Sequence, residues 1–218
     1  MRMYRINDIF YSLQGEGHNT GRAAVFIRFA GCNLRCPFCD TEFDSYREMS
    51  AEEILAEIAS LSPQHSQKPP LGEVGRGPVH PLIVLTGGEP TLQVDEAFVD
   101  LLHEHGYEVA MESNGTRPAP RNIDWLTVSP KIVGGEWRVK SGERLPDEVK
   151  VVFDEDTDPE TLLPPLSTLH LLPQLFLQPC DTGNPQRNAE IVARCVAYIK
   201  EHPEWRLSLQ THKLIGIA

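Results

Sequence analysis

Short apolar segments recur along the chain, and each of them ends at a polar or glycine-rich loop. Their length and their content of β-branched and aromatic residues are typical of buried β-strands. The six predicted strands are residues 23–29, 82–85, 107–111, 125–128, 148–153 and 175–177. Because loops after parallel strands lie at one edge of a sheet, the pattern predicts an α/β fold with a site along that edge. Residues 5–14 alternate only in part, and residues 206–210 are a candidate for a further strand.

Three helices are predicted beside these strands. Ser50 and Glu53 form a capping box in front of a helix that carries Ile54 and Ile58 on one face. Residues 94–105 and 188–200 predict two more helices. Three helices are few for about six parallel strands, so we expect an open partial (β/α) barrel with a reduced number of helices.

The expected organisation is a single domain over residues 1–218, because this length suffices for one sizeable core. Residues 62–81 are rich in proline, glycine, glutamine and serine, so we expect an exposed insertion there.

Composition narrows the function classes. The formal net charge is −11, and an acidic surface repels phosphate backbones, so we expect a small-molecule substrate and no nucleic-acid partner. No apolar run reaches the roughly 18 residues that a membrane span requires, and the first residues lack the apolar region of a secretory signal. Three of the five cysteines are clustered, which favours metal binding in a reducing compartment over disulfides. We therefore expect a cytoplasmic protein without a membrane partner.

Cys32, Cys36 and Cys39 follow the first predicted strand at the spacing C-x-x-x-C-x-x-C. Thiolates on such a short loop can each bind a different iron of a cuboidal iron–sulfur cluster. A [4Fe-4S] cluster would then keep one iron open for chemistry. The alternative is a structural zinc site with a distant fourth ligand. Zinc motifs more often pair two C-x-x-C sequences, and no second pair exists here.

The two remaining cysteines are isolated in the sequence. Cys195 shares a helical face with Ile191 and Ile199, so we interpret it as a core residue. Cys180 follows a predicted strand in the sequence Gln178-Pro179-Cys180-Asp181, and it is either a small buried side chain or part of the site.

The loop Thr86-Gly87-Gly88-Glu89-Pro90 follows a second buried strand. Paired glycines let a backbone approach a ligand closely, and Glu89 offers a carboxylate to an ammonium group. Alone, such a loop is most often a turn. Together with the cysteine loop, it resembles the radical S-adenosylmethionine (SAM) enzymes. That resemblance implies a [4Fe-4S] cluster whose fourth iron binds SAM, with Glu89 near the methionine amine.

Other polar positions have both a structural and a functional interpretation. Arg28 lies in an otherwise apolar strand, where an unpaired charge costs several kcal/mol, so it is expected to face an anion or a partner carboxylate. Glu16 is either a solvated loop charge or a site residue. Thr41 is either a turn residue or a hard oxygen ligand for Mg²⁺.

Taken together, these motifs and the sequences Glu112-Ser113-Asn114-Gly115-Thr116 and Gln210-Thr211-His212-Lys213 span nearly the whole chain. The combined set resembles the 7-carboxy-7-deazaguanine synthase family of radical SAM enzymes. The resemblance implies that Cys32, Cys36 and Cys39 hold the cluster and that Thr41 binds Mg²⁺. The implied SAM site consists of Phe38, Asp40, Gly88, Glu89, Ser129, Pro130, Lys131, Gln178, Pro179, Cys180 and Asp181. The implied substrate site consists of Leu13, Gln14, Gly15, Glu16, Arg28, Thr86 and the terminal carboxylate of Ala218.

The implied activity is that of a carbon–nitrogen lyase in queuosine biosynthesis, which supplies a precursor for tRNA modification. The enzyme would convert 6-carboxy-5,6,7,8-tetrahydropterin into 7-carboxy-7-deazaguanine with loss of ammonia. The implied partners are an external electron donor, flavodoxin-like or other, and a second copy in a homodimer. No side chain beyond the cluster ligands is assigned a catalytic role. The alternatives are a radical SAM activating enzyme that acts on a protein partner and a zinc-stabilised module without catalysis.

Overall fold

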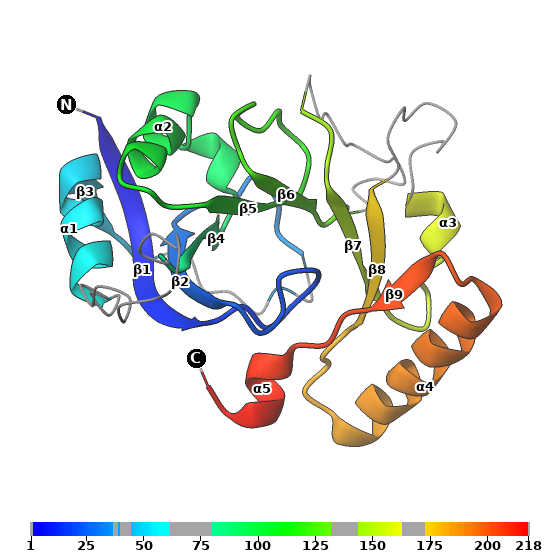
Figure 1. Ribbon diagram of the computed structural model, residues 1–218. Coiled ribbons are helices and arrows are strands. Elements are labelled where there is room, and N and C mark those ends of the chain that lie inside the picture. The colour runs from blue at the N-terminus through cyan, green and yellow to red at the C-terminus, as the bar shows by residue number, and fades with distance from the viewer. Residues whose placement is uncertain are drawn as a thin grey trace, which may run out of the picture.

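The computed structural model describes residues 2–36, 39, 45–61, 80–131, 144–162 and 173–217. They form one nine-stranded sheet in the order β3-β1-β2-β4-β5-β6-β7-β8-β9, which curves across the molecule (Figure 1). The strands are β1 (Met3–Leu13), β2 (Ala23–Phe29), β3 (Arg47–Ser50), β4 (Leu82–Gly87), β5 (Val109–Ser113), β6 (Trp125–Val128), β7 (Glu148–Phe153), β8 (Gln174–Pro179) and β9 (Trp205–Leu207). The helices are α1 (Ala51–Leu61), α2 (Glu96–Glu104), α3 (Pro159–Leu162), α4 (Pro185–Glu201), α5 (Thr211–Ile215) and the 3₁₀ turn η1 (Pro90–Leu92).

The strands from β2 to β9, apart from β3, run parallel to one another. All six strands predicted from apolar runs are present, and the candidate at residues 206–210 corresponds to β9. The open α/β architecture is therefore confirmed, with one parallel strand more than expected. At the other end, β1 pairs antiparallel with both β2 and β3. Its partial alternation arises because Tyr4, Ile6 and Ile9 are buried while the residues between them are more exposed.

Helices α1 and α2 cover one half of the outer face of the sheet, and α4 covers the other half (Figure 1). The capping box predicted before α1 is present, since Glu53 N–H donates to Ser50 Oγ at 3.2 Å and Ser50 N–H donates back to Glu53 Oε2 at 2.7 Å. Helix α2 begins later than predicted, because the Asp95 side chain accepts a hydrogen bond from Phe98 N–H and caps it. Helix α4 begins earlier, capped by Asn184.

Two apolar clusters fill the space under these helices. The larger one lies beneath α1 and α2 and includes Phe29, Phe98 and Leu102. The smaller one lies beneath α4 and contains Cys195 beside Ile191, with Ile199 packed against it. The interpretation of Cys195 as a core residue is confirmed, and burial raises the pKa of its thiol to about 12.

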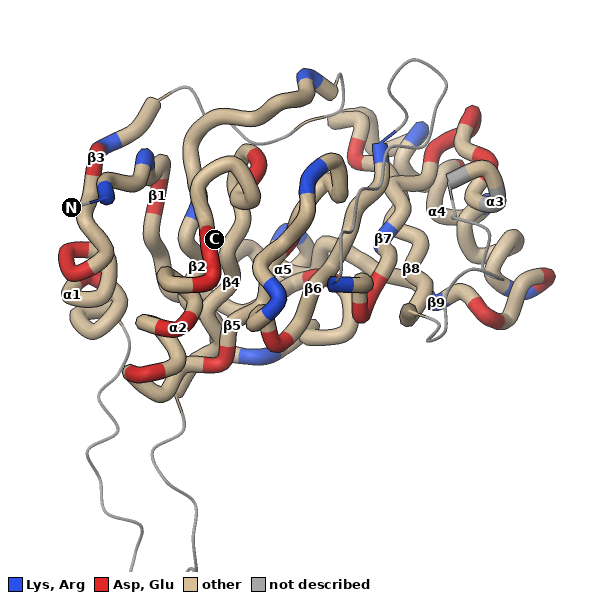
Figure 2. The backbone as a smooth tube through the Cα atoms, turned by 90° about the horizontal axis from the view of Figure 1, so that it is seen from above, with Lys and Arg blue, Asp and Glu red and all other residues tan. Residues whose placement is uncertain are grey.

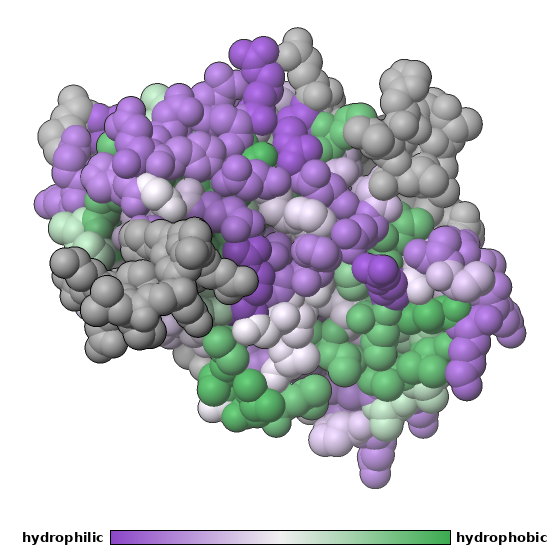
Figure 3. All heavy atoms as spheres, in the orientation of Figure 1, coloured by the Kyte–Doolittle hydropathy of each residue, from purple (hydrophilic) through white to green (hydrophobic). Residues whose placement is uncertain are grey.

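Acidic residues outnumber basic ones in the chain. Lysines and arginines are spread singly along the described trace among acidic positions (Figure 2). Exposed apolar side chains gather near α5, where Leu214 and Ile215 are exposed (Figure 3). Within the described residues, no helix is both long and apolar enough to cross a membrane. The insertion expected at residues 62–81 lies outside the described residues except for its last two.

Candidate active site

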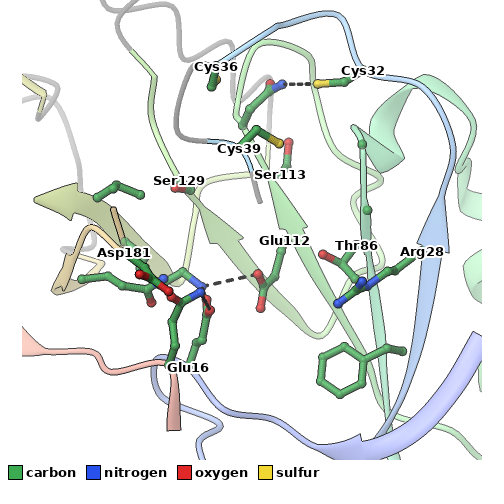
Figure 4. A pocket seen from close by; sticks show the side chains of 18 of the residues that line it. Glu16, Arg28, Cys32, Cys36, Cys39, Thr86, Glu112, Ser113, Ser129 and Asp181 are labelled. Carbon is green, nitrogen blue, oxygen red and sulfur yellow. Dashed lines mark hydrogen bonds and ion pairs between the residues drawn. The ribbon is translucent and has the colours of Figure 1, made fainter. Parts of the chain in front are cut away.

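A cavity of about 270 Å³ opens at the carboxyl ends of the parallel strands. Each strand from β2 to β8, apart from β3, brings lining side chains from its last residues or from the loop that follows it. The segment between β1 and β2 and the C-terminal segment close the opposite side. Figure 4 shows the cysteines at one end of this cavity and Arg28 and Thr86 at the other. The predicted site edge therefore exists, and it is one continuous hollow.

The three clustered cysteines all line the cavity. Leu34 N–H donates to Cys32 Sγ at 3.4 Å, and Asn114 Nδ2 donates to the same sulfur at 3.8 Å. Burial raises the pKa of Cys32, and it also raises the pKa of Cys36, which Lys131 lowers in part. These thiols consequently need an electropositive ligand to become thiolates, and a bound metal deprotonates a coordinating thiol outright.

The spacing of these thiols bears on the choice between zinc and a cluster. Among the described residues, no three His, Cys, Asp or Glu side chains are grouped tightly enough to hold one metal ion. A zinc site requires all its sulfur ligands within about 2.3 Å of a single ion. A cuboidal cluster takes each thiolate at a separate iron and so accepts a wider spread. The three cysteines line one end of the cavity from a single short loop, which is the donor set that a [4Fe-4S] cluster takes.

The glycine pair after β4 has a role different from the one that its sequence suggests. Gly87 has a φ of +111°, and a Cβ on Gly88 would lie 2.0 Å from the carbonyl oxygen of Gly31. Gly88 N–H donates to Phe29 O at 2.8 Å, and Glu89 N–H donates to Gly31 O at 2.9 Å. The close approach is thus to the chain's own backbone, and it fastens the start of the cysteine loop to the end of β4. Gly88 also lines the cavity, as expected for a SAM contact.

This contact makes Gly88→Ala a specific test of the packing. We expect the added methyl group to lower the free energy of unfolding by about 1–3 kcal/mol, because it must displace the Gly31 carbonyl. Chemical denaturation measures this change, and the iron content after reconstitution reports any distortion of the cysteine loop. Gly183→Ala is the control, since a Cβ there meets nothing within 4 Å although φ is +71°. Gly88 has no positive φ, so Gly183→Ala reports backbone strain that Gly88→Ala does not have. A Gly88→Ala variant as stable as the wild type would contradict the contact with Gly31.

Glu89 is fully buried and does not line the cavity. Its Oε1 accepts hydrogen bonds from Thr91 N–H, Thr91 Oγ1 and Ser113 Oγ at 3.0, 2.6 and 2.9 Å. Its Oε2 accepts from Asn114 N–H at 2.7 Å. The carboxylate therefore joins η1 to the end of β5 and places Asn114 beside Cys32. A direct contact of Glu89 with a ligand ammonium stays a prediction.

The loops after β6 and β8 contribute most of the other predicted SAM positions. The residues of this set that line the cavity are Ser129, Lys131, Gln178, Pro179, Cys180 and Asp181. Pro130 is buried next to them and does not line it. Lys131 Nζ donates to Ser129 Oγ at 2.7 Å, and burial lowers the pKa of this lysine. Asp181 forms an ion pair with Lys213 at 2.9 Å, and hydrogen bonds from Lys213, Gly183 and Asn188 lower its pKa to about 2.

The predicted substrate positions divide into two groups. Leu13, Gln14, Arg28 and Thr86 line the cavity. The guanidinium of Arg28 lies 4.9 Å from the centre of the Phe10 ring, and no carboxylate of the described residues pairs with it. Arg28 is therefore a cation held at the cavity wall, as its position in an apolar strand predicted.

Gly15 does not line the cavity and holds the C-terminal segment instead. Gly15 O accepts hydrogen bonds from Thr211 N–H at 3.0 Å and from Thr211 Oγ1 at 2.9 Å. Ser208 Oγ accepts a hydrogen bond from Gly17 N–H at 3.0 Å. This segment thus ties the end of the chain to the loop after β1. The sequence did not indicate that contact.

Glu16 lines the cavity, but both of its oxygens are occupied by the protein itself. Its Oε2 forms an ion pair with the buried Lys150, and its Oε1 accepts from Gln210 Nε2 at 3.1 Å. Burial would raise the pKa of Glu16, but the attraction of Lys150 and the hydrogen bonds outweigh burial and lower the pKa to about 2. The structure supports an organising role for Glu16 and leaves its contact with substrate a prediction.

Four predicted site residues lie outside the described residues: Phe38, Asp40, Thr41 and Ala218. Conversely, the cavity contains polar residues that were not predicted as site residues: Glu112, Asn114, Lys150, Gln210 and His212. Lys150 carried the same signal as Arg28, a charge within an apolar strand. The other residues were indicated only by the family motifs in which they lie.

Comparison with known proteins agrees with this geometry. Residues 26–130 match the model of the radical SAM superfamily. The 7-carboxy-7-deazaguanine synthase of Bacteroides thetaiotaomicron is 46% identical, with 99% of each chain covered. The enzyme of the same name from Nitratidesulfovibrio vulgaris is 42% identical, with 98% of this chain and 99% of that one covered. The crystal structure of QueE from Escherichia coli superimposes with a TM-score of 0.69 at 30% identity, covering 95% of this chain and 93% of that one. The chain therefore belongs to the 7-carboxy-7-deazaguanine synthase family of radical SAM enzymes.

Proposed function

We propose that this chain converts 6-carboxy-5,6,7,8-tetrahydropterin into 7-carboxy-7-deazaguanine with release of ammonia, as a lyase of queuosine biosynthesis. One observation carries the proposal. A single cavity joins three thiols suited to a [4Fe-4S] cluster at one end to a cation without a carboxylate partner among the described residues, Arg28, at the other. A substrate that bears a carboxylate is thereby held beside the reactive cofactor. The near full-length similarity to enzymes of that name supports the same activity.

Cys32, Cys36 and Cys39 would hold the cluster, and the loops after β4, β6 and β8 would bind SAM. When bound, the reduced cluster and SAM together supply reversible abstraction of a hydrogen atom from C6 of the pterin. The chain's own part is to position the two ligands and to exclude water. Lys131 and Asn114 place hydrogen-bond donors next to the cysteines, and such donors tune the electron affinity of a cluster.

At the other end, Arg28 would bind the substrate carboxylate. A guanidinium presents two parallel N–H donors that match a carboxylate, and stacking on Phe10 holds its plane. Thr86 pairs with Arg28 in the register of β2 and β4 and offers a hydroxyl from the neighbouring strand. Leu13 and Gln14 border the same region from the end of β1.

Replacing Arg28 tests this assignment. We expect Arg28→Gln to raise KM for the pterin about 10- to 100-fold, because a hydrogen bond to a charged group contributes roughly 1.5–3 kcal/mol. We expect the KM of Arg28→Lys to lie between those of the wild type and Arg28→Gln, since lysine keeps the positive charge but lacks the two parallel N–H donors of the guanidinium. Affinity for SAM, measured by calorimetry, is the internal control and should change little. A variant that loses SAM affinity while KM for the pterin stays unchanged would place Arg28 at the wrong end of the cavity.

The proposal includes further features that the family resemblance suggests. These are Mg²⁺ held by Thr41, an external one-electron donor of the flavodoxin type and a homodimer. The clustering of three of the five cysteines, which favours metal binding in a reducing compartment, accords with a cytoplasmic location. The exposed Leu214 and Ile215 near α5 are a surface that a second copy would cover (Figure 3). Sedimentation of the wild type and of a Leu214→Glu variant tests the dimer.

The decisive experiment is a product assay. The reconstituted and reduced protein is incubated with SAM, Mg²⁺ and 6-carboxy-5,6,7,8-tetrahydropterin. We expect equal amounts of ammonia and 7-carboxy-7-deazaguanine, with SAM not consumed. If an intact cluster yields neither product, the assignment fails. If SAM is instead converted to deoxyadenosine in proportion to turnover, the activating-enzyme alternative is favoured.

A further inference from the structure

A buried ammonium group organises the floor of the cavity. The Lys150 side chain is 5% exposed and lies between two carboxylates. It forms an ion pair with Glu16, and its Nζ lies 3.4 Å from Glu112 Oε2. Burial alone would lower the pKa of Lys150, but Glu112 and Glu16 outweigh it, and the pKa is raised. Lys150 therefore stays charged and does not serve as a proton donor.

Of the two carboxylates, Glu112 retains the capacity to accept a further hydrogen bond on the side that faces the cavity. Both oxygens of Glu16 are bound by Lys150 and Gln210. In Glu112, Oε1 accepts from Gln14 Nε2 at 2.8 Å, whereas Oε2 has, among the described residues, only the 3.4 Å contact with Lys150 Nζ. Figure 4 shows the Glu112 side chain in the middle of the cavity, between Glu16 and the wall that carries Arg28.

The proposed reaction requires a group that moves a proton. Substrate and product differ by one molecule of ammonia, so the conversion consumes no oxidant or reductant overall. In the last step, the bond between a ring carbon and the departing nitrogen breaks, and its electron pair stays on nitrogen. The neighbouring ring carbon loses a proton, and the electron pair of that C–H bond forms the ring double bond. The proton then has to reach the nitrogen, which leaves as ammonia.

The other charged residues of the cavity are poor candidates for this transfer. Lys131 lies at the cysteine end of the cavity, where its charge acts on Cys36. Arg28 is permanently protonated. Asp181 is held ionised by Lys213 and its hydrogen bonds, and its pKa of about 2 makes it a weak base. His212 lines the cavity as well, but its ring packs against Gly15, where a Cβ would lie 2.3 Å from Nδ1.

We propose that Glu112 is the catalytic residue that takes the proton from the ring carbon and delivers it to the departing nitrogen, and that Lys150 is a positioning residue that holds the Glu112 carboxylate at the floor of the cavity. This inference rests on the proposed function and deepens it. It assigns a proton-transfer role in the reaction to a protein side chain, beside the roles of the cofactors and the substrate-binding groups.

The test compares wild type with Glu112→Gln, which keeps an acceptor for Gln14 and cannot take a proton. The substrate carries deuterium at C6, and three quantities are measured: its affinity by calorimetry, the appearance of deuterium in SAM and the release of ammonia. We expect affinity and deuterium transfer to change less than about threefold, while ammonia release slows by roughly 10²- to 10⁴-fold. Glu112→Asp should restore part of the ammonia release, and His212→Gln should not separate deuterium transfer from ammonia release.

Each other outcome overturns the inference. If Glu112→Gln releases ammonia at the wild-type rate, Glu112 takes no part in this step. Parallel loss of affinity, or of deuterium transfer, means that Glu112 binds substrate or acts earlier. Separation of the two rates by His212→Gln instead assigns the transfer to that histidine. Failure of the proposed function is distinct, because the wild type itself would then release no ammonia.

Discussion

We expect Cys36→Ala to abolish activity while leaving most of the fold in place. Cys36 is one of three thiols that line the cavity from a loop beyond the end of β2, outside both apolar clusters. Removing one ligand deprives an iron of its only protein bond, so the cluster should be lost during reconstitution. Iron and sulfide analysis, the visible spectrum and the product assay measure the loss, and circular dichroism with thermal unfolding reports on the fold.

Cys195→Ala is the matched control for this prediction. It also removes a thiol, but from the core under α4 and far from the cysteine loop in sequence. We expect it to keep the cluster and to unfold at a lower temperature, since it leaves a small cavity. Global unfolding of Cys36→Ala with little effect of Cys195→Ala would instead support the structural zinc site.

The second large effect concerns stability. We expect Lys150→Met to lower the free energy of unfolding by about 3 kcal/mol, because it leaves the partly buried Glu16 and Glu112 near one another without their shared cation. Urea denaturation of both proteins at equal iron content measures the difference. Lys200→Met is the control, since this exposed lysine on α4 should give a change within about 0.5 kcal/mol.

Two further measurements distinguish the contribution of the ion pair to stability from that of side-chain packing. Adding Glu16→Gln to Lys150→Met should recover part of the loss, because the variant no longer buries an unpaired Glu16 carboxylate. In the wild type, the pKa of Glu16 is depressed from 4.5 to about 2. Its contribution to stability is therefore present above pH 4.5 and is lost as the pH falls toward 2. An acid-unfolding profile that is identical in wild type and Lys150→Met would argue against this coupling.

The sequence predicted most of the parallel sheet because each strand is buried on both faces and reads as an apolar run. Strand β1 lies near the edge and pairs antiparallel, so only part of its alternation was visible. Helix bounds were displaced by two or three residues at α2 and α4, where Asp95 and Asn184 cap the helices.

The site was predictable where a residue type is unusual in its local setting. Clustered thiols, paired glycines and a charge in an apolar strand each indicated a constraint. The residue that satisfies each constraint could not be predicted, because it lies far away in the sequence. Gly88 approaches Gly31 instead of a ligand, Glu89 is saturated by Ser113 and Asn114, and Glu16 meets a lysine 134 residues later.

The loop after β1 and the segment after β9 meet at the floor of the cavity, where Ser208 and Thr211 hold the loop that contains Gly15 and Gly17. A ribosome makes the loop first and its anchors last. The cysteine loop of the nascent chain is therefore made well before the cavity behind it can close. The floor closes only once two segments 196 positions apart in the sequence have both been made.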